Sequence, residues 1–513
     1  MLGAAAALGF RAGGGWVYGA NADRPWNLVP RAQGRANNYW CTWSAQNYMY
    51  GQGRASLDST ILEGESGAQL ARKALTETIV FGASGWAREF FPRARSELLF
   101  LFDDGWETGG NASFELDTAK FPSFGGSDAD RLRKLNHAIK ECGWQGAALW
   151  CRNPPDGKAG QNLETLSSSA GIDYWKIDIG DPTFALIKLR DKAGIPLVLE
   201  YAYGGGPLNG DWHTAGLLGP QRWDSGRMEI LRNADVYRIY DTTSMLSLPT
   251  TLNRVSQLLD TAQGHPEVHG LLNAEDEVYI AAALGCTMGV MRYPLIGLRP
   301  GKDTDLSFNG PRQTKRRMDE VTRAVRWQRI APPFAAGTGS VRLSSEILTD
   351  SWTFRVGETW MAGLVGATAY QGAPACITRN LNLPEVKAEG EKPFIFAARF
   401  PNGAVAVAAQ ERTRVDRAWY MPSCDISLTV ADARGPFGVF GDFGDLTLIF
   451  DRPPGVSRIL AQDLAGDTAT DITARVRAEG RTVRIPREVI RSAGLRDRTE
   501  EDLSSPGAVF AVL

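Results

Sequence analysis

The chain has few of the residue patterns that accompany metal or disulfide chemistry. Its six cysteines are scattered over 513 residues with no Cys-x-x-Cys spacing, which argues against a disulfide framework and against a structural zinc site. Four histidines are present, and none stands in a His-Glu-x-x-His motif. His265 and His269 are four residues apart, but Pro266 disfavours the helix that would pair them. The sequence therefore predicts no metal site.

Long apolar runs and regions of one charge sign are also missing. No stretch reaches the roughly eighteen apolar residues that a membrane-spanning helix needs. Lys and Arg total 56, Asp and Glu total 58, and the two signs are interspersed. We therefore expect a soluble protein that binds no nucleic acid and does not insert into membranes. The first ten residues, MLGAAAALGF, resemble part of a signal-peptide core. Secretion or periplasmic export of the native form and a cytoplasmic location both stay open.

Short apolar runs alternate with longer amphipathic runs between about residues 36 and 335. The strand-like runs are 37–45, 97–106, 146–152, 173–180, 195–203, 235–243, 268–276 and 287–295. Segments with apolar residues at three-to-four spacing lie between them and indicate helices, such as the one capped by Ser127 or Asp128 and ended by Gly143. Eight strands separated by helices predict a (β/α)8 barrel. A doubly wound open sheet is the alternative, although no Gly-x-Gly-x-x-Gly follows an early strand.

The sequence pattern changes after the barrel. Residues 341–513 hold short alternating or apolar runs such as SWTFRVG, FIFAARF and RTVRIP, punctuated by Gly, Pro, Asn and Asp. This pattern predicts a C-terminal antiparallel β-sandwich. Residues 1–35, rich in Gly and Ala, are expected to form an irregular extension against the barrel. The predicted division is thus 1–35, 36–335 and 341–513.

Carboxylates and aromatic residues gather where the predicted strands end. In a (β/α)8 barrel, the functional groups lie at the C-terminal ends of the strands. Carboxylates accept hydrogen bonds from hydroxyls and aromatic rings offer an apolar floor, so this mouth suits a neutral, polyhydroxylated ligand. The candidate binding residues are Asp103, Asp104, Trp106, Trp150, Lys176, Glu200, Tyr201 and Arg238.

Structural roles stay open for several of these residues. Asp103 and Asp104 are also suited to cap the following helix. Lys176 and Asp178 share strand parity, so both should point into the barrel, where a structural ion pair is the alternative to a catalytic role. Asp241, followed by two threonines, fits a turn or a helix cap as well.

Taken in chain order, the motifs resemble the clan D α-glycosidases, glycoside hydrolase families 27 and 36, the α-galactosidase group. The similar segments are YWCTW (39–43), FLFDDGWE (100–107), YWKID (174–178) and RIYD (238–241). The resemblance implies that Asp178 is the catalytic nucleophile and Asp241 the catalytic acid/base. It also implies that Asp103 and Asp104 hold sugar hydroxyls. Asp235 is the rival acid/base, but it stands at a strand start and should point to the opposite face of the barrel.

The chain departs from the family pattern in detail. Gly105 and Ile179 stand where family 27 usually has Cys and Asn, and Arg238 and Asp241 are closer together than is typical. The resemblance implies a divergent retaining hydrolase that releases a terminal α-linked sugar by double displacement, with an α-galactoside as the leading substrate. No cofactor is expected. The alternatives are an α-N-acetylgalactosaminidase, a transglycosylase, a lyase and a non-catalytic carbohydrate-binding barrel.

Overall fold

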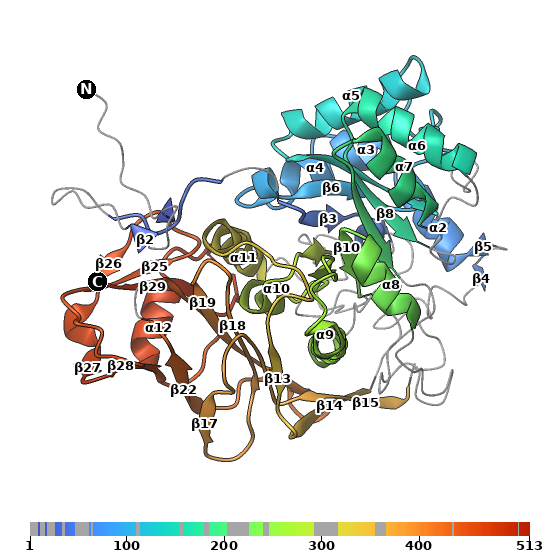
Figure 1. Ribbon diagram of the computed structural model, residues 1–513. Coiled ribbons are helices and arrows are strands. Elements are labelled where there is room, and N and C mark those ends of the chain that lie inside the picture. Colours follow the sequence, from blue (N-terminus) through green and yellow to red (C-terminus); the bar gives the residue numbers. More distant parts are fainter. Residues whose placement is uncertain are drawn as a thin grey trace, which may run out of the picture.

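The architecture was taken from a computed structural model. It describes residues 9–10, 16–17, 26–32, 36–46, 61–62, 65–108, 113–152, 157–178, 184–202, 225–239, 246–291, 317–353, 366–432, 435–500 and 502–513. A parallel barrel lies beside a C-terminal β region, with helices α10 (Val278–Leu284) and α11 (Met318–Ile330) between them (Figure 1).

Eight parallel strands form the barrel that the sequence predicts. They are β3 (Tyr39–Cys41), β6 (Leu99–Phe102), β7 (Gly146–Arg152), β8 (Tyr174–Asp178), β9 (Val198–Ala202), β10 (Val236–Arg238), β11 (Leu271–Asn273) and β12 (Gly289–Val290). Chain neighbours pair in parallel from β3 to β11, and β12 pairs with β3. A parallel bridge between Asn273 and Thr287, just before β12, closes the ring. The open-sheet alternative is therefore wrong.

Helices follow the strands around the outside. They are α2 (Gly67–Ala74), α3 (Glu77–Phe81), α4 (Trp86–Glu89), α5 (Asp128–Glu141), α6 (Gly157–Ala170), α7 (Ala185–Ala193), α8 (Ser225–Asn233) and α9 (Ser247–Ala262). Helix α5 begins at the predicted cap: the Ser127 hydroxyl accepts from the Asp130 amide, and Asp130 reciprocates. It ends at Cys142, and Gly143 follows with φ +90°. Within the described segments, no helix is both long and apolar enough to cross a bilayer.

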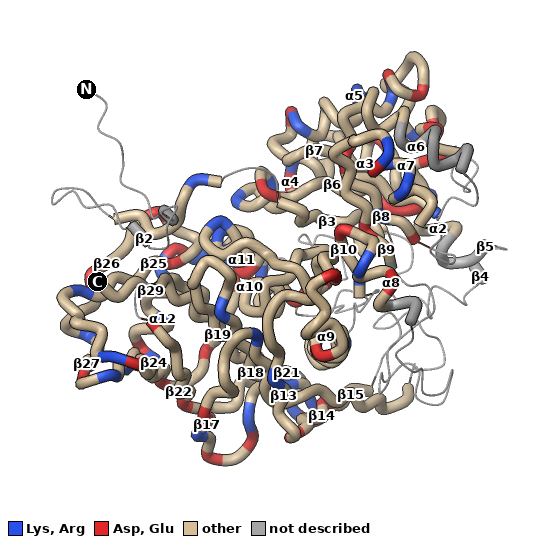
Figure 2. The backbone as a smooth tube through the Cα atoms, in the orientation of Figure 1, with Lys and Arg blue, Asp and Glu red and all other residues tan. Residues whose placement is uncertain are grey.

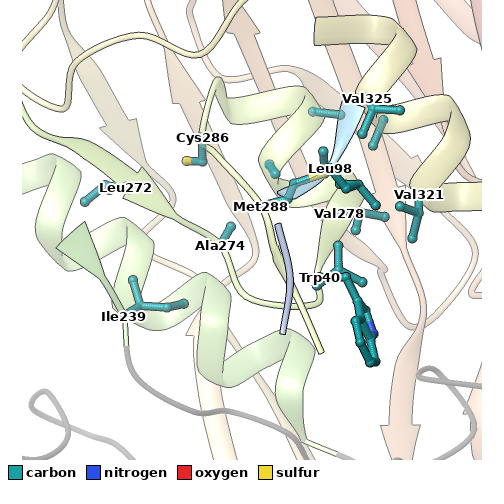
Figure 3. Packing of buried hydrophobic residues seen from close by; sticks show 14 of the residues in the cluster. Trp40, Leu98, Ile239, Leu272, Ala274, Val278, Cys286, Met288, Val321 and Val325 are labelled. Carbon is teal, nitrogen blue, oxygen red and sulfur yellow. The ribbon is translucent and has the colours of Figure 1, made fainter. Parts of the chain in front are cut away.

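Most of the apolar side chains of the barrel pack between its strands and helices. Trp40 is fully buried there, edge-on to Trp86, Phe90 and Phe100. Figure 3 shows Trp40 and Leu98 in this layer, with Val321 and Val325 of α11 nearby. Along each strand, residues that face the helices alternate with residues that face the barrel interior. The inward-facing residues are therefore the ones available to form a site.

Two sheets form the body of the C-terminal region. The larger contains β13 (Val341–Leu343), β16 (Cys376–Arg379), β18 (Phe394–Arg399), β19 (Val405–Gln410), β23 (Phe437–Phe440), β29 (Gly507–Val512), β25 (Ile459–Asp463) and β26 (Thr470–Asp471). The smaller contains β17 (Glu385–Ala388), β22 (Cys424–Val430), β24 (Leu446–Phe450), β28 (Thr482–Ile485) and β27 (Arg477–Glu479). Apolar residues of both sheets belong to one core cluster, with helix α12 (Arg487–Gly494) against it.

The prediction of a purely antiparallel arrangement is wrong in one respect. Three described strand pairs are parallel: β16 with β18, β19 with β23, and β22 with β24. In each pair the chain visits a strand of the other sheet before it returns, so the two strands run in the same direction. Sequence alternation reports which face is buried and carries no information about strand direction. Two ribbons complete the region: β14 (Ile347–Thr353) with β15 (Thr368–Pro374), and β20 (Arg412–Arg414) with β21 (Ala418–Tyr420).

Buried polar contacts join the barrel to the C-terminal sheets. Arg323 of α11 forms an ion pair with Asp463 of β25, with Nε 2.9 Å from Oδ1. Arg379 of β16 donates to the carbonyl oxygens of Leu284, at the end of α10, and of Ala335, both at 2.7 Å.

A carboxylate of the C-terminal region caps α11. Asp502 Oδ2 accepts hydrogen bonds from the amides of Met318 and Asp319, at 2.9 and 3.2 Å. Burial raises the pKa of Asp502 to about 6. Acidic and basic residues are interspersed along the described parts of both regions (Figure 2).

Candidate active site

Strand parity decides which candidate residues face the barrel interior. Tyr39, Cys41, Trp150 and Tyr174 belong to an inner apolar cluster separate from the outer core. Lys176 is two residues after Tyr174 on β8 and lies opposite Glu200 of β9. The side chains with inward parity therefore meet near the ends of neighbouring strands, as barrel geometry requires.

Asp178 stands at the last position of β8 and keeps contact with solvent. Its side chain is 14% exposed, whereas Arg238 of β10 is fully buried. Asp178 Oδ2 lies 2.8 Å from Arg238 Nη2 and accepts a hydrogen bond from Trp150 Nε1 at 3.3 Å. Three residues predicted from separate motifs thus come together on one carboxylate oxygen. An adjacent guanidinium favours the ionised form of a carboxylate, which is the form a nucleophile needs.

Lys176 has a different principal partner from the one the sequence suggested. Its ammonium lies 2.7 Å from Asp103 Oδ2, and the Cys41 thiol donates to the same oxygen at 3.0 Å. Asp103 Oδ1 also accepts the Asp104 amide at 2.8 Å. Lys176 and Asp103 are both almost fully buried. The cation in direct contact with Asp178 is Arg238.

Asp104 turns toward helix α2. Arg72 of that helix donates from Nε and Nη2 to Asp104 Oδ2, at 2.8 and 2.6 Å. Burial raises the pKa of Asp104, and the hydrogen bond and charge of Arg72 oppose the rise. No sequence motif links a helix arginine to this strand end, so Arg72 was missed.

Glu200 lies in the centre of the barrel rather than at its rim. It is fully buried and accepts hydrogen bonds from Tyr39 Oη and Tyr174 Oη, both at 2.9 Å, and from Asn273 Nδ2 at 2.7 Å. Burial raises the pKa of Glu200, and the charge of Arg238 is the largest effect against the rise. Tyr39 and Tyr174 were not among the candidates, although their inward strand parity was available from the sequence.

Two aromatic candidates lie away from the inner cluster. Trp106 is fully buried in the outer core, edge-on to Trp175, and its Nε1 donates to the Trp150 carbonyl at 2.8 Å. Gly105, with φ +115°, turns the chain just before it. Tyr201 also joins the outer core, beside Phe184, because it alternates with the inward Glu200.

Of the two acid/base candidates, the structure describes one. Asp241 lies outside the described residues. Asp235 stands at the start of β10, where it forms an ion pair with Arg190 of α7 and accepts the Leu199 amide at 2.9 Å. Its contacts thus place it at the end of the barrel opposite Asp178 and Arg238.

No family model and no curated protein matches this chain. Among solved structures, it is similar to the carboxyl transferase domain of pyruvate carboxylase from Rhizobium etli, at 16% sequence identity and a TM-score of 0.29. The match covers 60% of this chain and 55% of that one, so the chain spans about half the length of that structure.

Proposed function

We propose that this protein is a retaining glycoside hydrolase that releases a terminal α-linked sugar, with α-galactosides as the leading substrates. The observation that carries the proposal is the setting of Asp178. It is a carboxylate at a strand end, partly open to solvent, with one oxygen bound by a buried guanidinium and an indole N–H. The resemblance of the strand motifs to clan D α-glycosidases supplies the reaction class.

The reaction would proceed by double displacement. Asp178 attacks the anomeric carbon while Asp241 protonates the departing glycosidic oxygen, which gives a covalent glycosyl ester. Asp241 then removes a proton from water, and the water attacks the anomeric carbon and frees Asp178. Arg238 and Trp150 contact one oxygen of Asp178 and orient the carboxylate. A retaining enzyme needs its two carboxylates roughly 5–5.5 Å apart.

The sugar-binding part of the proposal rests on Asp103 and Asp104. Both lie at the end of β6, and each has a cation beside it, Lys176 for Asp103 and Arg72 for Asp104. Such pairs hold a carboxylate in a fixed position, where its oxygens can accept hydrogen bonds from hydroxyl donors. We expect Asp104→Ala to lower kcat/KM strongly, because a site built around hydroxyls loses several kcal/mol when a polar partner is removed.

A screen of aryl α- and β-glycosides (galactose, N-acetylgalactosamine, glucose, xylose, arabinopyranose and fucose), with direct detection of the released sugar, tests the activity. Product analysis separates the alternatives: a transglycosylase makes new oligosaccharides, a lyase leaves unsaturated ends, and a binding protein leaves the glycoside intact. Absence of hydrolysis on every α-glycoside would refute the proposal.

Two substitutions test the roles of the carboxylates. Asp178→Ala should abolish turnover, and azide should restore it with formation of a β-glycosyl azide, because the anion attacks from the vacated face. Asp241→Ala should spare dinitrophenyl glycosides, which need no proton in the first step. Asp235→Asn, at the opposite end of β10, is the matched control and should leave the chemistry intact. Equal damage by Asp241→Ala to activated and unactivated substrates would remove that residue from the acid/base role.

A further inference from the structure

One buried guanidinium in the barrel is shared by three carboxylates. Arg238 presents Nη2 to Asp178 at 2.8 Å, Nη1 to Glu275 at 3.2 Å and Nε to Glu200 at 3.8 Å. Arg238, Glu200 and Glu275 are fully buried, whereas Asp178 reaches solvent. A different nitrogen faces each carboxylate, and the hydrogen bond among the three contacts is the one that Nη1 donates to Glu275 Oε1.

Glu275 is held by the backbone around it. It lies two residues after Asn273, whose amide oxygen accepts the Gly289 amide at 2.7 Å. The next residue, Asp276, has a φ of +55° and accepts the Met291 amide at 2.7 Å. A non-glycine residue in the left-handed region persists only where its surroundings hold it. Glu275 therefore cannot withdraw from Arg238 by a simple movement of the chain.

Several other groups act on the two carboxylates. The described polar and titratable groups that face Asp178, pair with it in the sheet or act on its charge include Arg238 of β10, Asp104 at the end of β6 and Lys176 of its own strand. From β7 they include Trp150, Cys151 and Arg152, the last of which is the register partner of Asp178. Those that face Glu275 are Arg238 and, from β3, Tyr39. Arg238 is the group in direct contact with both carboxylates.

We propose that Glu275 is a positioning residue that competes with Asp178 for Arg238 and so sets the pH range in which Asp178 is ionised. The proposal rests on the proposed role of Asp178 as nucleophile. A cation beside a carboxylate favours ionisation, and a second carboxylate on that cation offsets part of the effect. Glu275 thus weakens the electrostatic stabilisation that Arg238 gives to the nucleophilic carboxylate, which must remain both ionised and reactive.

The test is the pH dependence of kcat/KM on the best aryl α-glycoside. In Glu275→Gln the competing charge is gone, so the acidic limb should move to lower pH by roughly one unit. Glu277→Gln is the matched control: Glu277 is also buried, two residues further on, but it accepts from the Ser247 hydroxyl at 2.6 Å. In Glu277→Gln the acidic limb of the kcat/KM profile should lie at the same pH as in the unmodified protein. An unmoved limb in Glu275→Gln, or a shift to higher pH, overturns the proposal.

Two further measurements keep the test decisive. Should Glu275→Gln fail to fold, Glu275→Asp retains the charge but draws it back from Nη1, and its limb should move in the same direction by a smaller amount. A double-mutant cycle of Glu275→Gln with Asp178→Asn, measured by urea unfolding across pH, detects the same coupling without any substrate. Coupling in the cycle together with no glycosidase activity would refute the proposed function alone. Additive effects in the cycle would refute the role of Glu275.

Discussion

The ion pair between Lys176 and Asp103 permits a quantitative prediction that needs no substrate. Lys176 is 1% exposed, and its ammonium lies 2.7 Å from Asp103 Oδ2. Lys176→Met keeps the apolar stem and removes the charge. Asp103 would then keep only neutral donors, among them the Cys41 thiol and the Asp104 amide. Removal of one partner of a buried pair costs about 3–5 kcal/mol.

Equilibrium urea unfolding at pH 7, followed by tryptophan fluorescence, measures this cost. The double variant Lys176→Met with Asp103→Asn should recover much of the loss, because it leaves no unpaired charge. Lys188→Met, at an exposed position of α7, is the control and should change stability by less than about 0.5 kcal/mol. A loss below about 1 kcal/mol in Lys176→Met, or a double variant that recovers none of the loss, would refute the reasoning.

Three further predictions concern stability. Asp502 has a pKa raised from 3.8 to about 6, so the unmodified protein should lose up to about 3 kcal/mol relative to Asp502→Asn as pH rises from 4 to 7, measured by urea unfolding. Gly289→Ala should cost about 1–3 kcal/mol because its Cβ would lie 2.6 Å from a tyrosine hydroxyl of the barrel interior, whereas Gly125→Ala meets nothing within 4 Å. Arg379→Met removes two hydrogen bonds between the barrel and β16 and should lower the free energy of unfolding by about 2–4 kcal/mol. Arg342→Met, at an exposed position of β13, is the control and should change it little. Equal losses for the two variants in thermal unfolding would contradict this prediction.

The barrel was predictable because its signal is repeated. Eight apolar runs separated by amphipathic helices leave few other folds, and each run coincides with a strand of the ring. The inward position of Lys176 followed from parity alone. Parity also separates Tyr201 from its neighbour Glu200, and a strict use of it would have assigned the tyrosine to the outer core.

Partner choice inside the barrel could not be predicted in the same way. Lys176 shares inward parity with Asp178, but its long stem reaches across to Asp103 on β6. Which carboxylate it meets depends on strand register and tilt, which no local pattern encodes. The partner of Arg72 could not be predicted for the same reason, because Arg72 lies on a helix and contacts Asp104 only in the closed barrel. Charged contacts between distant segments are a property of the assembled barrel.

The charge balance of the interior explains why one carboxylate remains partly open to solvent. Among the described residues, the ion pairs discussed above join two cations to four carboxylates, a formal excess of two negative charges if all are ionised: Lys176, Arg238, Asp103, Asp178, Glu200 and Glu275. Burial makes such an excess costly unless a group holds a proton or retains water. Glu200, fully enclosed, has a raised pKa, and Asp178 at the strand end keeps solvent contact. Of these four carboxylates, the one at the strand end is therefore the one in contact with solvent, which agrees with the role proposed for Asp178.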